Sequence, residues 1–93
     1  MTEHERVVAA RLREYKAVLA LPEFKYLPIC HVCNTVNPED GGCDGCLFYF
    51  GDESCLDGPH QHTGHTCLTR EEQILQFDWL LSQCARNGYI PHM

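Results

Sequence analysis

Two pairs of cysteines near the middle of the chain have the spacing of a metal site. Cys30 and Cys33 form one Cys-x2-Cys pair, Cys43 and Cys46 form another, and nine residues separate the two pairs. Each such turn places two sulfur atoms on one side of an ion, so two turns together complete a tetrahedron. Zn²⁺ is the usual ion for four cysteine thiolates. The spacing therefore predicts a zinc site built from these four residues.

A site closed by four cysteines has a structural role and not a catalytic one. It leaves no open position at which the metal could bind and activate water. A thioredoxin-like redox role for Cys30 and Cys33 needs a βαβ pattern, and this chain does not have that pattern. Gly45, inside the second pair, suits a turn that needs a positive φ angle. We therefore expect this first site to hold the fold together.

A second group of metal-ligand side chains lies within thirteen residues further along the chain. Its members are Cys55, His60, His62, His65 and Cys67. Four of them could bind a second Zn²⁺. If only three bound it and one coordination position stayed open, the site could be catalytic, and the nearby acids Asp52, Glu53 and Asp57 could supply a general base. Three alternatives stay open: the histidines are ordinary loop residues, Cys55 replaces a ligand of the first site, or Cys67 is a buried thiol. We therefore expect one zinc ion, with two as the alternative.

The central segment, residues 27–68, is acidic and contains no lysine or arginine. It carries six acidic residues, and the whole chain of 93 residues has a formal net charge of −6 at pH 7. Nucleic-acid affinity depends largely on Lys and Arg side chains that neutralise phosphates, and this segment has none. We therefore expect a protein partner with a basic surface. The alternative is that the acids only keep a small protein in solution.

The N-terminal sequence and the cysteine content favour a cytoplasmic protein. The first residues are polar and charged, unlike a secretory signal peptide. No run approaches the roughly 20 apolar residues that cross a membrane. Cytoplasmic thiols stay reduced, which favours metal binding over disulfides, and the odd number of cysteines (seven) fits a closed disulfide framework poorly.

Helices are expected on both sides of the central segment. Residues 2–21 begin with a capping box at Thr2 and Glu5, and Pro22 ends the helical pattern. Residues 69–88 begin with a second capping box at Thr69 and Glu72 and end at an Asn-Gly pair. The expected apolar faces are Val8, Leu12, Tyr15 and Leu19 in the first helix, and Ile74, Phe77, Leu81 and Cys84, with Leu80 alongside, in the second.

The expected fold is one small α+β domain, residues 1–93, stabilised by zinc. Its two helices pack around a loop-rich, zinc-ribbon-like insert with short strands, residues 22–68, and residues 89–93 form a tail. The apolar run Leu47–Phe50, which Gly51 ends, is predicted to be a short buried strand. The core of so short a chain is modest, so a homodimer is an alternative to a monomer.

The segment from Cys30 to Cys55, which includes Gly42-Cys43-Asp44-Gly45-Cys46, resembles small cysteine-rich zinc-binding proteins of bacteriophages and prophages. The resemblance covers under a third of the chain. It implies a phage-encoded protein that acts in the host cytoplasm, where it binds and inhibits a host factor.

A second segment, Pro59-His60-Gln61-His62-Thr63-Gly64 followed by Cys67, is similar to part of the His-Me finger endonucleases. This resemblance implies that His60 or His62 activates water beside a bound Mg²⁺. Pro59 stands where that family has a metal-binding aspartate, and both cysteine pairs precede the segment instead of flanking it.

We therefore expect a non-enzymatic zinc-binding protein that binds and modulates another protein. One alternative is a metal-dependent nuclease or hydrolase that uses the histidines between His60 and His65. Another is a DNA-binding zinc ribbon. Its basic face would come from the first helix: Arg6, Arg11, Arg13 and Lys16.

Overall fold

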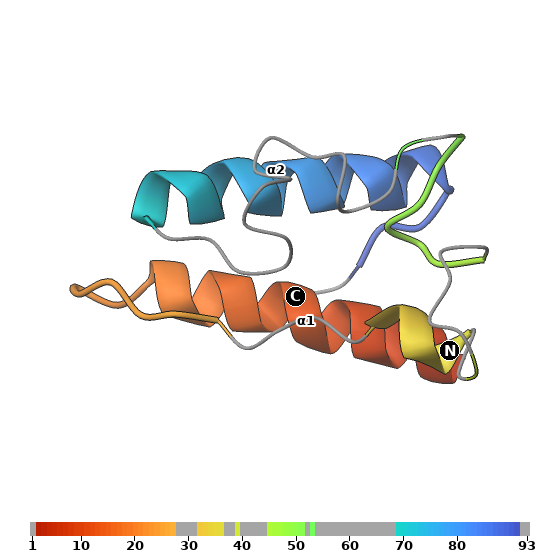
Figure 1. Ribbon diagram of the computed structural model, residues 1–93, viewed down its shortest axis with the longest axis horizontal. Helices are drawn as coiled ribbons and strands as arrows, with labels where there is room; N and C mark the ends of the chain where they lie inside the picture. Colours follow the sequence, from red (N-terminus) through yellow and green to blue (C-terminus); the bar gives the residue numbers. More distant parts are fainter. Residues whose placement is uncertain are drawn as a thin grey trace.

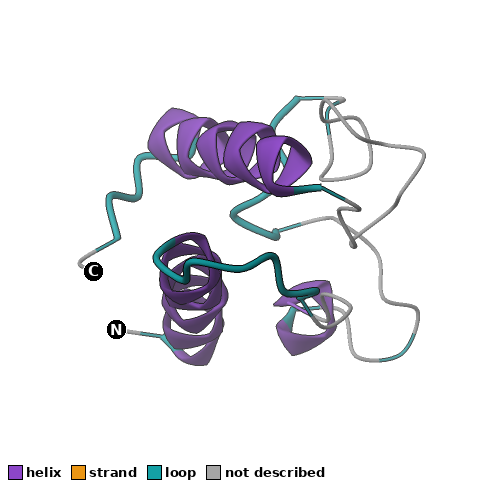
Figure 2. Cartoon of the chain, turned by 90° about the vertical axis from the view of Figure 1, so that its left-hand side faces the viewer, coloured by secondary structure: helices purple, strands orange, loops and turns teal. Residues whose placement is uncertain are grey.

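The computed structural model describes residues 2–27, 32–36, 39, 45–51, 53 and 69–91. These residues form two long helices, α1 (Glu3–Leu19) and α2 (Arg70–Arg86), and the short 3₁₀ helix η1 (Val32–Thr35). Figure 1 shows α1 and α2 side by side and running in opposite directions. In the view of Figure 2, α2 lies in the upper part of the molecule, and α1 and η1 lie next to each other below it. Helix α1 contacts both α2 and η1.

Helix α1 begins with the capping box that its sequence predicts. The backbone N–H of Glu5 donates to the hydroxyl of Thr2 at 3.1 Å, and the Glu5 carboxylate accepts the N–H of Thr2 at 2.8 Å. These two bonds satisfy donors that the first turn of a helix otherwise leaves without partners. The buried face runs through Val8, Leu12 and Tyr15, and Val18 takes the place that the sequence pattern assigned to Leu19.

Helix α2 is closed at both ends by local hydrogen bonds. The Thr69 hydroxyl accepts the N–H of Glu72 at 3.1 Å at the start of the helix. At its end the N–H groups of Gly88 and Tyr89 donate to the carbonyls of Ala85 and Cys84, each at 2.9 Å. Gly88 has a φ angle of 78°, the left-handed conformation that this C-terminal motif requires and that glycine adopts without strain.

The buried face of α2 agrees only in part with the predicted apolar face: Leu80 and Cys84 are buried as predicted, and Ile74 is not. Its buried residues are Gln73, Gln76, Leu80, Gln83 and Cys84. Ile74 is exposed, and Phe77 and Leu81 are only partly buried against the core. The glutamine side chains point inward because their amides donate to loop carbonyls; the amide of Gln73 donates to the Lys25 carbonyl at 2.7 Å. Glutamines therefore occupy inward positions that the apolar pattern did not assign to the buried face.

The hydrophobic core fills the space between the two helices and the ends of the central segment. The rings of Tyr15 and Phe77 stack with their centroids 5.9 Å apart, which joins α1 to α2. From the central segment, Val32 and Phe48 are buried in the same cluster. The remaining members of the core are Val8, Leu12, Val18, Leu27, Cys46, Leu80 and Cys84.

The prediction of an α+β fold with a strand-containing, zinc-ribbon-like insert is wrong, because the described residues form helices and no strands. In the predicted strand Leu47–Phe50, the first two residues lie in turns, and among the described residues the pairing is an isolated bridge between Phe50 and Glu53. Gly51, with a φ angle of 62°, lies between these two residues. The carbonyls of Leu47 and Phe48 accept hydrogen bonds from side chains of α2. They therefore need no neighbouring strand as a partner.

Candidate functional site

Most of the predicted metal ligands belong to parts of the chain that the structure does not describe. Cys46 is described and buried, and the backbone of Cys33 belongs to η1. The predicted ligands outside the described residues are Cys30, Cys43, Cys55, His60, His62, His65 and Cys67. Within the described ranges, no three His, Cys, Asp or Glu residues are gathered in a way that could hold a metal ion. The two predicted sites therefore stay predictions.

The His4 side chain joins the two segments that contain Cys33 and Cys46. Its Nε2 accepts the backbone N–H of Leu47, the residue after Cys46, at 2.9 Å. Its Nδ1 lies 2.6 Å from Oγ1 of Thr35, two residues after Cys33. Because Nε2 accepts a hydrogen bond, the proton of the neutral ring is on Nδ1, which donates to Thr35. One imidazole on α1 thus holds both segments.

The surroundings of His4 keep the ring neutral. The Thr35 hydroxyl, which accepts from the ring, itself donates to the carbonyl of Val32 at 2.7 Å. His4 is 8% exposed. Burial lowers the pKa of the His4 imidazole from its ordinary value, although the Val32 carbonyl and the Glu5 carboxylate act in the opposite direction. A neutral ring near pH 7 is what the acceptor role of Nε2 requires.

A cavity of about 480 Å³ lies where the two segments meet the first turn of α1. Its lining residues are Thr2, Glu3, His4, Glu5, Thr35, Val36, Gly45 and Leu47. A Cβ atom at Gly45 would lie 3.9 Å from the Cβ of Val36, so the segments approach each other here as well. Gly45 has a φ angle of 85°, which confirms the positive value expected inside the second cysteine pair.

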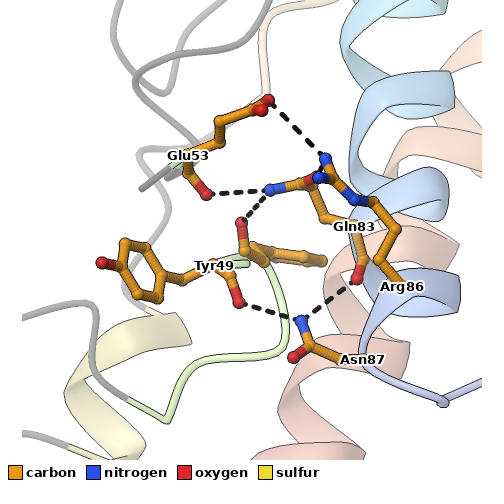
Figure 3. Close-up of polar contacts among 6 residues, drawn as sticks. Tyr49, Glu53, Gln83, Arg86 and Asn87 are labelled. Atoms are coloured by element: carbon orange, nitrogen blue, oxygen red, sulfur yellow. Dashed lines mark hydrogen bonds and ion pairs between the residues drawn. The ribbon is translucent and has the colours of Figure 1, made fainter. Parts of the chain in front are cut away.

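Side chains of α2 and of its C-cap residue Asn87 bind backbone carbonyls of the residues after Cys46, and Figure 3 shows the contacts to Tyr49 and Glu53. The Asn87 amide donates to the Leu47 carbonyl at 3.0 Å. It also donates to the Tyr49 carbonyl at 2.9 Å, a bond that Figure 3 shows. The Gln83 amide donates to the Glu53 carbonyl at 2.8 Å. Leu47 therefore has its N–H bound by α1 and its carbonyl bound by α2. The backbone next to Cys46 is fixed on two sides.

The thiols of Cys46 and Cys84 lie in the hydrophobic core. Cys46 is 6% exposed, and Cys84 is fully buried, as the sequence pattern predicts for it. Burial raises the pKa of the Cys84 thiol to about 12, and the neighbouring Cys46 contributes to the shift. The Cys84 thiol is therefore protonated at neutral pH and is a poor nucleophile.

The basic face of α1, which DNA binding would require, is smaller than the sequence predicts. Arg11 is buried, and its guanidinium group lies 5.2 Å from the centroid of the Tyr15 ring. An Nη1 atom of the same side chain is 3.7 Å from the Glu14 carboxylate. Arg6, Arg13 and Lys16 are the members of the predicted basic face that are exposed.

Two kinds of structural residue were missed by reasoning from the sequence. His4 lies four positions before Val8 and so continues the apolar stripe of α1, although the predicted apolar face did not include it. Gln73, Gln76 and Gln83 recur at helical spacing on one face of α2, a pattern that could have marked them as buried. In both cases a polar residue lies on the buried face of its helix.

Within the described part of the chain, neither long helix has the length and apolar character needed to span a membrane. Comparisons with protein-family models, with curated proteins and with solved structures found no match to this chain.

Proposed function

We propose that this chain is a non-enzymatic zinc-binding protein that acts by binding another protein. The observation that carries the zinc proposal is the contact of one imidazole, His4, with the residues beyond Cys33 and Cys46. These contacts bring the end of the first cysteine pair and the end of the second to the same place on α1. The proposed ligands are Cys30, Cys33, Cys43 and Cys46.

The chemistry of the four ligands supports a structural role for the metal. Thiolates are the ligands that a structural Zn²⁺ prefers, and four of them leave no coordination position for water or substrate. Regular backbone pairing contributes little to the central segment where the structure describes it. In the described residues that segment contains a 3₁₀ helix, turns and one isolated bridge. A bound metal would supply folding free energy where regular backbone hydrogen bonding is sparse.

The charge distribution supports a protein partner. The central segment carries acidic residues and no Lys or Arg, so it repels nucleic-acid phosphates and complements a basic protein surface. Binding of this kind weakens as salt screens the charges. Capture of partners on the immobilised protein, followed by elution with increasing salt, tests this part. Capture that is equally strong in about 1 M salt would contradict the electrostatic proposal.

Elemental analysis of the purified protein tests the zinc proposal. We expect about one Zn²⁺ per chain, lost in Cys30→Ser or Cys43→Ser and retained in the control Cys55→Ser. Removing the metal with a chelator should reduce the helical signal in circular dichroism, because ligation and folding are coupled. Protein that contains no zinc, or that keeps its zinc in both ligand variants, would overturn the proposal. About two zinc ions per chain, one of them lost in Cys55→Ser, would add the second site.

A further inference from the structure

Helix α2 carries its exposed aliphatic side chains on the face that points away from the core. Ile74 is 44% exposed and Leu75 is 49% exposed, although both are large aliphatic residues in the middle of a regular helix. With the helical spacing i, i+3, i+4, i+7 and i+11 they belong to one stripe, here called the outer face of α2. Its members are Glu71, Ile74, Leu75, Asp78 and Ser82, all exposed.

The exposure of these aliphatic residues follows from the polar inner face. Gln73 and Gln83 must point inward, because their amides bind loop carbonyls at 2.7 and 2.8 Å. A helix has one inward side, so residues on the opposite side of the helical projection from these glutamines point outward. Ile74 and Leu75 therefore contribute little to the core, and an exposed pair of this kind is typical of a contact surface.

The charges on the outer face are acidic, whereas the arginines at the two ends of α2 make contacts within the molecule. Glu71 lies one turn before the aliphatic pair and Asp78 one turn after it on the same face. The Arg70 guanidinium donates to the carbonyls of Leu21 and Glu23. The Arg86 guanidinium lies 4.6 Å from the centroid of the Phe50 ring and 3.6 Å from the Glu53 carboxylate. The outer face thus combines two aliphatic anchors with negative charge.

We propose that the outer face of α2 is the docking surface for a basic amphipathic helix of the partner protein. Aliphatic side chains of that helix would pack on Ile74 and Leu75, and flanking Lys or Arg side chains would pair with Glu71 and Asp78. The inference deepens the proposed function, because it rests on the expectation of a basic partner and names the surface that binds it. Charge complementarity selects a cationic helix over an anionic one.

A fluorescently labelled synthetic helix, with leucines on one side and lysines on the other, serves as the probe. Its binding to the full-length, zinc-loaded protein is measured by anisotropy. We expect Ile74→Ser with Leu75→Ser, and separately Glu71→Gln with Asp78→Asn, to weaken binding about tenfold or more. The control for the aliphatic variant is Leu21→Ser with Ile90→Ser, which changes exposed aliphatic residues outside the outer face. The control for the charge variant is Glu3→Gln with Glu14→Gln, which removes the same amount of negative charge from α1. Neither control should change binding by more than about twofold.

Three outcomes would overturn the docking proposal. Equal affinity of the outer-face variants and the wild type would show that this face does not bind the probe. Equal loss in the outer-face and control charge variants would show attraction by net charge alone. Self-association of the wild type that Ile74→Ser with Leu75→Ser abolishes, without probe binding, would make a second copy of the chain the occupant. The zinc content of every variant is measured in parallel, so a failed zinc site and a failed docking surface are distinguished.

Discussion

At the scale of single residues, His4 is the side chain that joins two separate parts of the central segment to α1. Its two ring nitrogens contact residues 31 and 43 positions away, and both contacts are short. An imidazole can do this because one nitrogen donates while the other accepts, which a protonated ring cannot do. The structural role of His4 therefore depends on its neutral form.

Replacing His4 tests this role through the stability of the zinc-loaded protein. In His4→Ala the N–H of Leu47 loses its acceptor, and we expect a loss of about 1–3 kcal/mol in the free energy of unfolding. His4→Gln should lose less, because its amide oxygen could accept the same N–H. Urea unfolding at about pH 7.5 measures both variants, with the exposed Arg6→Ala as the control. Equal stability of His4→Ala and the control would contradict the assigned role.

The same variants respond differently to acid. Burial lowers the pKa of His4 in the folded protein below the ordinary value of 6.5 that it has in the unfolded chain. Below pH 6.5 the unfolded chain therefore binds more protons at this position than the folded protein does. The stability that His4 contributes is fully present above that pH and is lost as the pH falls through the lowered pKa of the folded protein. We expect the advantage of the wild type over His4→Gln to shrink over this range. A constant difference down to about pH 5 would show that His4 does not titrate as the structure requires.

At the scale of elements, local signals predicted the helices and their ends better than they predicted what the helices bury. The capping box of α1 and the C-terminal glycine of α2 depend on a few neighbouring residues, so the sequence reveals them. The inward glutamines of α2 and the non-strand conformation of Leu47–Phe50 depend on each other across the fold. Apolar periodicity cannot show that a glutamine amide will replace a neighbouring strand as the partner of a carbonyl.

Gln83 tests whether the polar inner face of α2 stabilises the fold. Its amide donates to the carbonyls of Phe48 and Glu53, so Gln83→Leu leaves both without that donor. We expect a loss of about 1–3 kcal/mol in the free energy of unfolding, despite the similar size and greater hydrophobicity of leucine. Ser82→Ala, on the outer face of α2, is the control. Equal or greater stability of Gln83→Leu in urea would mean that apolar packing, and not hydrogen bonding, decides this position.

At the scale of the whole molecule, two antiparallel helices hold the ends of a central segment that has little regular structure of its own where it is described. Contacts from α1 through His4 and from α2 through Asn87 meet at Leu47. The cysteine spacing, read from the sequence, predicts the metal ligands, but neither this spacing nor the apolar pattern reveals that both helices fix the backbone beside Cys46. A metal bound by the four cysteines would complete this arrangement by closing the segment between the two pairs.

The absorption spectrum of the Co²⁺-substituted protein tests directly whether the two cysteine pairs bind one metal ion. Co²⁺ takes the tetrahedral position of Zn²⁺, and its visible and charge-transfer bands report the number of thiolate ligands. We expect the spectrum of a tetrahedral four-thiolate site at about one Co²⁺ per chain, abolished in Cys43→Ser and unchanged in Cys55→Ser. A weak octahedral spectrum, or a thiolate spectrum that survives Cys43→Ser, would contradict a zinc site made by the two cysteine pairs.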